Sequence, residues 1–304
     1  MTQPPANVVP VCYRHPNRET YVRCTRCNQP ICPDCMNEAS VGFQCPDCVR
    51  QGARTQRPAQ TAFGGSRAGS AGTVTIALIV VNILAFIATV ISSGGTDAVA
   101  GGGWGGLLGQ QTPLHEGLGM LGAATYPGGG PLHGVAAGEY YRLVTGMFLH
   151  FGLLHLALNM WVLWSVGRPL EQTLGRARYF ALYMIAGIGG NVAAYAFTAP
   201  NVINAGASGA VFGLFGALIV VWRRMRLSVA GIVPVLILNL VLTFSISNIS
   251  VGGHIGGLIT GTLAAIGLAY APRNHRTLVQ VAAFVVLALL LAVLVAWRTT
   301  DLIG

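Results

Sequence analysis

Apolar residues dominate the chain from Thr73 onward, where they form long runs separated by short polar stretches. Several runs approach the roughly 20 residues that an α-helix needs to cross the apolar core of a bilayer. The pattern predicts an all-α polytopic membrane protein. The expected spans, each within a few residues, lie at about 73–91, 147–166, 178–198, 207–222, 231–247, 253–271 and 277–297.

Composition supports this class and argues against a nucleic-acid partner. Of the 304 residues, 53% are hydrophobic and only 9% are charged, whereas soluble proteins carry about 25% charged residues. All 18 basic residues are Arg, and the net charge is +9. Most of these Arg residues lie before the first apolar run or in short loops, which is the positive-inside pattern of membrane proteins. We expect a lipid bilayer as a partner and no nucleic acid.

The distribution of Arg predicts the orientation. The connections 167–177, 223–230 and 272–276 carry Arg, whereas 199–206 and 248–252 carry none. Because short Arg-bearing loops stay in the cytoplasm, the N-terminus is expected to be cytosolic and the C-terminus extracytoplasmic, in a multi-pass protein of the plasma (cell) membrane. The first apolar run starts some 70 residues into the chain and is interpreted as an uncleaved signal anchor.

Few polar or ionisable residues lie within the predicted spans, where such groups are costly and usually functional. They are found near the starts of the second, fourth and sixth spans, which all enter the membrane from outside. We therefore expect these polar residues to lie at one depth in the membrane, near its outer surface: His150, His155, Asn159, Ser208 and His254. The remaining histidines of the membrane part, His115, His133 and His275, lie in predicted loops and are expected to be solvated.

Glycine is frequent where the fourth and sixth spans begin. The fourth span contains Gly206, Gly209, Gly213 and Gly216, and the sixth contains Gly253, Gly257 and Gly261. Small residues at four-residue spacing let two helix backbones approach closely. Such an approach would bring a short serine side chain within reach of an imidazole on another helix. Either residue alone would indicate helix packing, but together they suggest a nucleophile and its base.

Three motifs carry a family resemblance. HFGLLHLALN (150–159), GASG (206–209) and GHIGGLITG (253–261) occur in this order on alternate spans and resemble the rhomboid intramembrane serine proteases. EYYR (139–142) resembles the acidic–x–aromatic–Arg motif of that family's first loop, with Tyr141 where Trp is common. The resemblance covers about 73–297. It implies a six-helix core, to which this chain adds a C-terminal seventh helix.

The resemblance also implies a serine endopeptidase that cleaves transmembrane protein segments near the extracytoplasmic face without a cofactor. Ser208 would be the nucleophile and His254 the general base of a Ser–His dyad. The oxyanion hole would comprise His155, Asn159 and the Ser208 backbone N–H. Supporting roles would fall to His150, which has a purely structural alternative, and to Gly206, Phe212 (where some members have Tyr), Glu139 and Arg142.

Two other classes remain open. One is a catalytically inactive rhomboid-like protein that binds membrane clients, which is disfavoured because Ser208 and His254 are both present. The other is a small transporter. A transporter needs polar groups near the middle of the membrane, whereas those of this chain are predicted to gather at one side.

Residues 1–48 hold all seven cysteines, and these residues predict a metal-binding module. The cysteines and one histidine form pairs with two-residue gaps: Cys12 and His15, Cys24 and Cys27, Cys32 and Cys35, Cys45 and Cys48. Eight ligands suffice for two tetrahedral, structural Zn²⁺ sites. Disulfides are the competing interpretation, but the predicted cytosolic location is reducing.

The spacing of these pairs resembles B-box zinc fingers. That resemblance implies alternate pairing, with Cys12, His15, Cys32 and Cys35 at one ion and Cys24, Cys27, Cys45 and Cys48 at the other. We expect the module to contact a cytosolic protein partner or to act in regulation, rather than to catalyse. The predicted domains are thus the zinc module (1–48), a flexible linker (49–72) rich in Gly, Ser, Arg and Gln, and the membrane domain (73–304).

Overall fold

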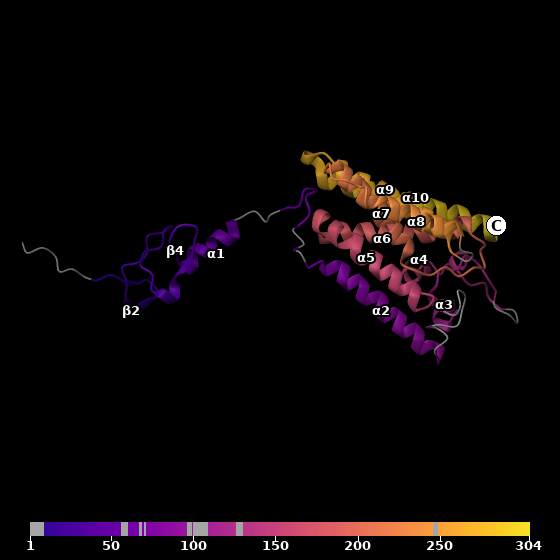
Figure 1. Cartoon of the computed structure of the whole chain (residues 1–304), viewed down its shortest axis with the longest axis horizontal. Helices are drawn as coiled ribbons and strands as arrows, with labels where there is room; N and C mark the ends of the chain where they lie inside the picture. The colour runs from indigo at the N-terminus through magenta and orange to yellow at the C-terminus, as the bar shows by residue number, and fades with distance from the viewer. Residues whose placement is uncertain are drawn as a thin grey trace, which may run out of the picture. The chain divides into compact units, whose positions relative to one another are not determined.

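The computed structural model describes residues 9–55, 60–66, 69, 71–95, 99, 109–125, 130–245 and 249–304 (Figure 1). The chain forms two units, Met1–Ala59 and Gln60–Gly304, which are described separately. The first unit contains all the cysteines and the second contains the long apolar helices.

The first unit is small and is built around its cysteines. Its elements are β1 (Val11–Cys12), β2 (His15–Glu19), the 3₁₀ turn η1 (Pro33–Cys35), β3 (Asn37–Glu38), β4 (Phe43–Gln44) and α1 (Pro46–Thr55). Strands β1 and β2 pair antiparallel, as do β3 and β4. Six of the seven cysteines are buried, and Ile31 is the fully buried aliphatic residue beside them. So small an apolar core contributes little hydrophobic free energy to folding. This indicates that other interactions stabilise the unit.

The predicted flexible linker, 49–72, differs in part from the structure. Helix α1 extends through residues 49–55, and Gln60 bridges to Ser66 in a short loop of the second unit. Phe63, at the tip of this loop, is buried in the apolar core. The Gly- and Ser-rich composition of this stretch did not predict that a phenylalanine within it would be buried. Residues 56–59, 67–68 and 70 of the predicted linker lie outside the described residues.

Helices make up nearly all of the second unit. The long helices are α2 (Thr73–Ser93), α5 (Leu153–Leu174), α6 (Arg176–Phe197), α7 (Ser208–Arg224), α8 (Val233–Ser245), α9 (Val251–Tyr270) and α10 (Arg276–Ile303). The short elements are α3 (Pro113–Leu118), η3 (Val135–Ala137), α4 (Arg142–Thr145), η4 (Gly146–Phe148) and η5 (Arg273–His275). Figure 1 shows the long helices lying side by side, with α2 along one flank of the bundle.

The helices confirm the predicted all-α membrane class. By length and composition, four of the described helical segments could each cross a membrane: Thr73–Ser93, Arg176–Phe197, Val251–Tyr270 and Arg273–Ile303. A fifth span results if Arg142–Phe148 and Leu153–Leu174, which meet at 93°, count as one. Helices α7 and α8 occupy the fourth and fifth predicted positions but are shorter, so the count of seven spans stays a prediction.

The second predicted span, 147–166, was placed too early. Its helix, α5, begins at Leu153 after Gly152, whose φ of 83° interrupts the helical path. It then continues to Leu174, so the predicted loop 167–177 shrinks to a turn at Gly175. Arg168 and Arg176 suggested a loop in this region, but both residues are helical.

A buried carboxylate joins the ends of two of these helices. Glu171, on α5, is fully buried and accepts hydrogen bonds from the backbone N–H groups of Val74 (3.0 Å) and Thr75 (2.9 Å) and from the Thr75 hydroxyl (2.9 Å). These N–H groups belong to the first turn of α2, which has no cap of its own. A negative charge there satisfies unpaired donors and complements the helix dipole. Glu171 therefore fixes the start of α2 against the end of α5.

Helices α6, α7 and α9 cross closely because glycine lines their contacts. A Cβ at Gly190 on α6 would lie 2.7 Å from the Gly253 carbonyl oxygen on α9. A Cβ at Gly257 on α9 would overlap the Gly209 carbonyl oxygen on α7. Side chains at these positions would push the helices apart. The thin faces expected from the glycine spacing thus hold the starts of α7 and α9 together.

We predict that Gly257→Ala lowers the thermal unfolding midpoint in detergent and reduces any activity that needs both helices. The new methyl group would meet backbone atoms, which have no rotamer by which to escape, so a cost of about 1–3 kcal/mol is expected. Gly231→Ala, in the turn before α8, is the control, because a Cβ there would have no neighbour within 4 Å. Equal midpoints for the two variants would contradict the proposed role of this crossing.

Candidate functional site

Ser208 is the first residue of helix α7, at the end of the unit where α5 and α9 also begin. It is partly exposed, and the backbone enters it through Gly206, whose φ is 142°. That conformation favours glycine. A Cβ at Gly206 would lie 2.9 Å from His155 Cε1 and 3.5 Å from Ser208 Oγ. The absence of a side chain at Gly206 therefore leaves a space bordered by both groups.

His254 reaches the same place from the fourth residue of α9. Its imidazole stacks on the ring of Phe212, with centroids 4.3 Å apart and planes 17° apart. Phe212 lies one helical turn after Ser208 on α7, so both residues share a face of that helix. No hydrogen bond joins Ser208 to His254 among the described residues. The structure brings their two helices into contact and places the imidazole beside the face that carries the serine.

Thr243, on α8, holds the other side of the imidazole. Its Oγ1 lies 2.7 Å from His254 Nδ1 and donates its own proton to the Asn239 carbonyl at 2.7 Å. A hydroxyl has one proton to donate, so at this contact it accepts the Nδ1 proton of His254. Nε2 is then the nitrogen with the free lone pair. Thr243 is not among the site residues expected from the sequence, where its only signal is a polar position four residues after Asn239.

His155 and His150 lie on the other side of Ser208, but only His155 is helical. The two rings meet edge to face with centroids 5.1 Å apart. His150 is fully buried in the non-helical segment before α5, and its Nε2 accepts the Ala207 backbone N–H at 3.4 Å. The expected position of His150 on the second span is thus wrong, because Gly152 delays the helix. His150 instead contacts the backbone that leads into Ser208.

Asn159 is placed one turn below His155 as expected. Its Nδ2 donates to the His155 carbonyl at 3.0 Å, and the residue is buried. In this arrangement the amide is engaged with its own helix. That bond uses one of the two Nδ2 protons, so the other remains to donate to an oxyanion.

His115 was expected to be solvated, and this is wrong. It is fully buried on α3, stacks on Phe151 with centroids 4.4 Å apart, and its Nε2 lies 3.3 Å from the His150 carbonyl. Its Nδ1 accepts from the Thr112 N–H at 3.3 Å, so Nε2 carries the proton that binds this carbonyl. The sequence before this short helix has no periodic apolar pattern. A single histidine in a long Gly-rich segment therefore could not be predicted to be buried. His133 is half-buried beside Glu139, while His275 is exposed.

Arg142 and Glu139 lie together in the segment before α5. Arg142 is only 2% exposed, and its Nε donates to Glu139 Oε2 at 2.5 Å. Its Nη1 donates to the carbonyls of Glu116 (2.7 Å) and Gly119 (2.9 Å). Burial works against the charged form of Glu139, but the Gly134 N–H and the Arg142 guanidinium hold its pKa below the usual range. The pair ties α3, η3 and α4 into one loop beside the site.

The first unit, Met1–Ala59, is called the cysteine module from here on, and its candidate ligands lie in two groups. Cys12, His15, Cys32 and Cys35 form one group, and Cys24, Cys27, Cys45 and Cys48 form the other, with the ligand atoms of each group within 4.8 Å of one another. His15 Nδ1 lies 3.2 Å from Cys32 Sγ and 3.4 Å from Cys35 Sγ, and the Sγ atoms of Cys27 and Cys45 are 3.7 Å apart. Ligands about 2.3 Å from a tetrahedral ion lie about 3.8 Å apart. The donor set and spacing fit Zn²⁺.

The crowding of thiols within each group also favours a cation. In the first group, burial opposes ionisation of Cys12, yet backbone hydrogen bonds from Cys32 and Arg14 lower its pKa to about 6. Burial and the neighbouring Cys12 and Cys32 side chains raise the pKa of Cys35 to about 11. In the second group, burial and neighbouring thiols raise the pKa of Cys48 to about 12. Without a metal the thiols of one group cannot all ionise near pH 7, whereas a divalent cation stabilises every thiolate.

Comparison with known proteins places the second unit in a family. A family model described as the Rhomboid domain matches residues 137–271. The rhomboid protease GluP of Bacillus subtilis is 42% identical over 161 residues, covering 51% of this chain and 31% of that protein. The putative rhomboid protease YdcA of Bacillus subtilis is 36% identical over 135 residues, covering 43% of this chain and 68% of that protein. RHOMBOID-like protein 5 of Arabidopsis thaliana is 33% identical over 147 residues, or 46% of this chain and 47% of that protein.

The family match and the geometry coincide. Residues 137–271 include the loop with Glu139 and Arg142 and the helices with Ser208 and His254, but not the cysteine module or α10. The chain spans about a third of the length of GluP and about two thirds of YdcA, at an identity that establishes shared ancestry. This multi-pass membrane protein therefore belongs to the rhomboid family.

Proposed function

We propose that the chain is an intramembrane serine endopeptidase in which His254 takes the proton of Ser208 and the serine attacks a backbone carbonyl. The observation that carries the proposal is the stacking of His254 on Phe212, one turn from Ser208 across the glycine-lined crossing of α7 and α9. The reaction would require a hydrogen bond from Ser208 Oγ to His254 Nε2. The same imidazole would later return the proton to the leaving amine.

The hydrogen bond from His254 to Thr243 supports the basic role. With Nδ1 donating to Thr243 Oγ1, Nε2 is unprotonated and available as the base. A dyad has no carboxylate to select this tautomer, and the threonine hydroxyl supplies the selection without a negative charge inside the bilayer. We assign Thr243 as a positioning residue, since it touches the imidazole rather than the reacting atoms.

Substituting Thr243 tests this assignment. Thr243→Val keeps the shape but removes the acceptor, so part of the His254 population would protonate at Nε2. We expect kcat to fall by about 10–100-fold with little change in KM, less than the roughly 10⁴-fold loss when a triad carboxylate is changed to its amide. Thr243→Ser restores the hydroxyl and should recover most of kcat. A serine variant as slow as the valine variant would show that packing, not the hydrogen bond, matters.

The oxyanion would be held beside Gly206. His155 borders the space there, and the Ser208 backbone N–H, at the start of α7, has no partner within its own helix. Asn159 would join them with the second proton of its Nδ2 group. One such donor is worth roughly 3–4 kcal/mol of barrier. His150 is assigned a positioning role through its hydrogen bond to the Ala207 N–H.

The proposed substrates are transmembrane segments of other proteins, cut near the extracytoplasmic face of the plasma membrane. The site lies at the end of the bundle opposite to the Arg-bearing turns, which the positive-inside rule assigns to the cytoplasm. A cytosolic N-terminus and an extracytoplasmic C-terminus follow. Helix-weak residues such as Gly or Pro in the substrate would expose the carbonyl to attack.

Labelling with a fluorophosphonate probe tests the activity class. The wild-type chain in detergent or bilayers should label, and Ser208→Ala should not. Wild-type protein that stays unlabelled while binding membrane clients would support the catalytically inactive alternative instead.

We further propose that the cysteine module holds two structural Zn²⁺ ions and contacts a cytosolic protein. The two ligand groups support the first part, because each supplies four soft or borderline donors and no open position. Closed sites of this kind fold a module and do not catalyse. The partner is proposed only from the location of the module.

A further inference from the structure

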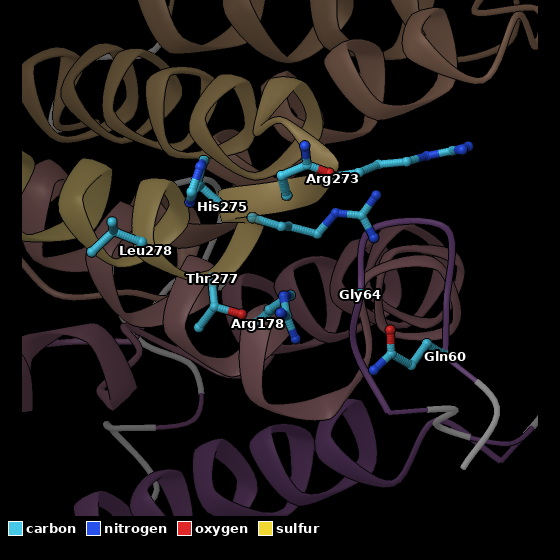
Figure 2. Close-up of a pocket in the computed structure, with 9 residues that line it drawn as sticks. Gln60, Gly64, Arg178, Arg273, His275, Thr277 and Leu278 are labelled. Carbon is cyan, nitrogen blue, oxygen red and sulfur yellow. The ribbon is translucent and has the colours of Figure 1, made fainter. Parts of the chain in front are cut away.

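A hollow lies at the opposite end of the membrane unit from Ser208. Its volume is about 340 Å³, and it is formed by the loop Gln60–Gly64, the start of α6 and the turn between α9 and α10. Figure 2 shows Arg178, on α6, on one side of the hollow and the turn that carries Arg273 and His275 on the other. Arg276, at the start of α10, also lines it. We name this hollow the arginine pocket.

No carboxylate lines the arginine pocket to balance these charges. Within the described part of the chain, neither Arg178, Arg273 nor Arg276 forms an ion pair. Two of the guanidinium groups also converge, because a Cβ at Gly64 would lie 3.1 Å from Arg276 Nη1 and 3.5 Å from Arg178 Nη2. Like charges this close repel each other unless an anion lies between them. The charge pattern therefore fits a bound anion.

The pocket is built from fixed parts rather than from free surface side chains. Gln280, only 4% exposed, accepts the Arg178 Nε–H at 2.8 Å, and its own Nε2 donates to the Phe63 carbonyl at 3.2 Å and the Leu268 carbonyl at 2.9 Å. One amide thus orients Arg178 and joins the loop to α9 and α10. Gly64, with φ of 83°, contributes no side chain to the space that the arginines face.

The surroundings favour a lipid over a soluble anion. The edge of the pocket is Leu278, which is 69% exposed, and along the same helix Val281 and Val285 are at least half exposed. The apolar part of α10 is almost unburied, as expected of a surface that faces acyl chains. The N-terminus of α10 also has no side-chain cap, so its unpaired N–H groups add to the positive field.

We propose that the arginine pocket binds the phosphate of an anionic phospholipid headgroup, with the acyl chains lying along α10. Guanidinium groups pair with phosphate through parallel N–H donors, and basic pockets at the cytoplasmic ends of helices suit such headgroups. The proposal rests on the cytoplasmic orientation of this end and not on the peptidase activity. It therefore stands or falls independently of Ser208.

Titration of the full chain with phosphatidylglycerol in neutral detergent tests the site, with bound lipids counted by native mass spectrometry. Phosphatidylcholine and inorganic phosphate serve as the other two arms. We expect phosphatidylglycerol to bind at least tenfold more tightly than phosphatidylcholine. Arg178→Gln and Arg276→Gln should each weaken it about fivefold, corresponding to about 1 kcal/mol per arginine.

Arg223→Gln is the matched control, because Arg223 is exposed in the last turn of α7 and does not line the pocket. It should change the affinity less than twofold. Gly64→Ala fills the pocket without altering the charge and should also weaken binding, which separates the site from a general surface effect. Equal binding of the two lipids, or an equal loss in Arg223→Gln, would overturn the proposal. Inorganic phosphate as effective as the lipid would overturn its assignment to a lipid headgroup.

Discussion

Membranes from cells that produce the Ser208→Ala variant are expected to release none of the membrane-protein fragments that the wild-type chain releases. Removal of a serine nucleophile lowers kcat by about 10⁶-fold, which is below detection in such an assay. Ser208 is partly exposed at the start of α7, so its loss removes few packing contacts. Fragment release is measured by mass spectrometry of the extracytoplasmic fraction, with expression matched between the strains.

Ser165→Ala is the matched control. Ser165 is an exposed serine of α5 whose hydroxyl donates to the Trp161 carbonyl of its own helix. This variant should release fragments like the wild type. His254→Ala should be as inactive as Ser208→Ala, and the double variant no worse, because members of a catalytic unit do not contribute additively. Undiminished cleavage by Ser208→Ala would mean that another nucleophile performs the reaction, and the proposed dyad would be wrong.

The parts of this site that the sequence predicts are those whose signal is periodic. Gly253 and Gly257 recur at the spacing that thins a helix, and the structure has these residues at the crossing of α7 and α9. The alternation of Arg-bearing loops placed Ser208 and His254 at one end. Both signals depend only on helix geometry and on the membrane, so they can be recognised in a sequence without knowledge of tertiary contacts.

The residues that sequence analysis missed act through contacts between segments distant in the chain. Thr243 meets His254 only because α8 packs beside α9, and His115 is buried only because α3 folds under His150. Glu171 falls within the predicted connection 167–177, yet it is fully buried where it caps α2, 96 residues away from Thr75. A polar residue gives the same sequence signal whether water or a distant helix satisfies it.

The two units differ in what stabilises their folds. In the membrane unit, apolar burial and close helix packing stabilise the fold, and the site is an addition to it. In the cysteine module the ligands themselves are the core, because six of the buried residues are cysteines and Ile31 is the aliphatic residue at their centre. The spacing of the ligands could therefore predict both groups, since there is little else in the module to fold around.

Removal of zinc is accordingly expected to unfold the module and to leave the membrane unit intact. The binding of a structural Zn²⁺ ion corresponds to about 10–16 kcal/mol at pH 7, far more than so small an apolar core supplies. The purified full chain should contain two zinc ions by elemental mass spectrometry. A strong chelator should make residues 9–55 sensitive to trypsin, while the helical circular dichroism of the remainder should persist.

Variants of single ligands test each ligand group in turn. Cys12→Ser should reduce the zinc content through the first ligand group and Cys24→Ser through the second. Arg50→Ala is the control, because it removes an exposed ion pair with Asp47, and such surface pairs contribute little to stability. Full protease resistance after chelation, or a purified chain whose cysteines are joined as disulfides, would refute the metal assignment. Because the ligand groups interleave along the chain, loss of one ion should also loosen the other, so that each cysteine variant retains less than one tightly bound zinc.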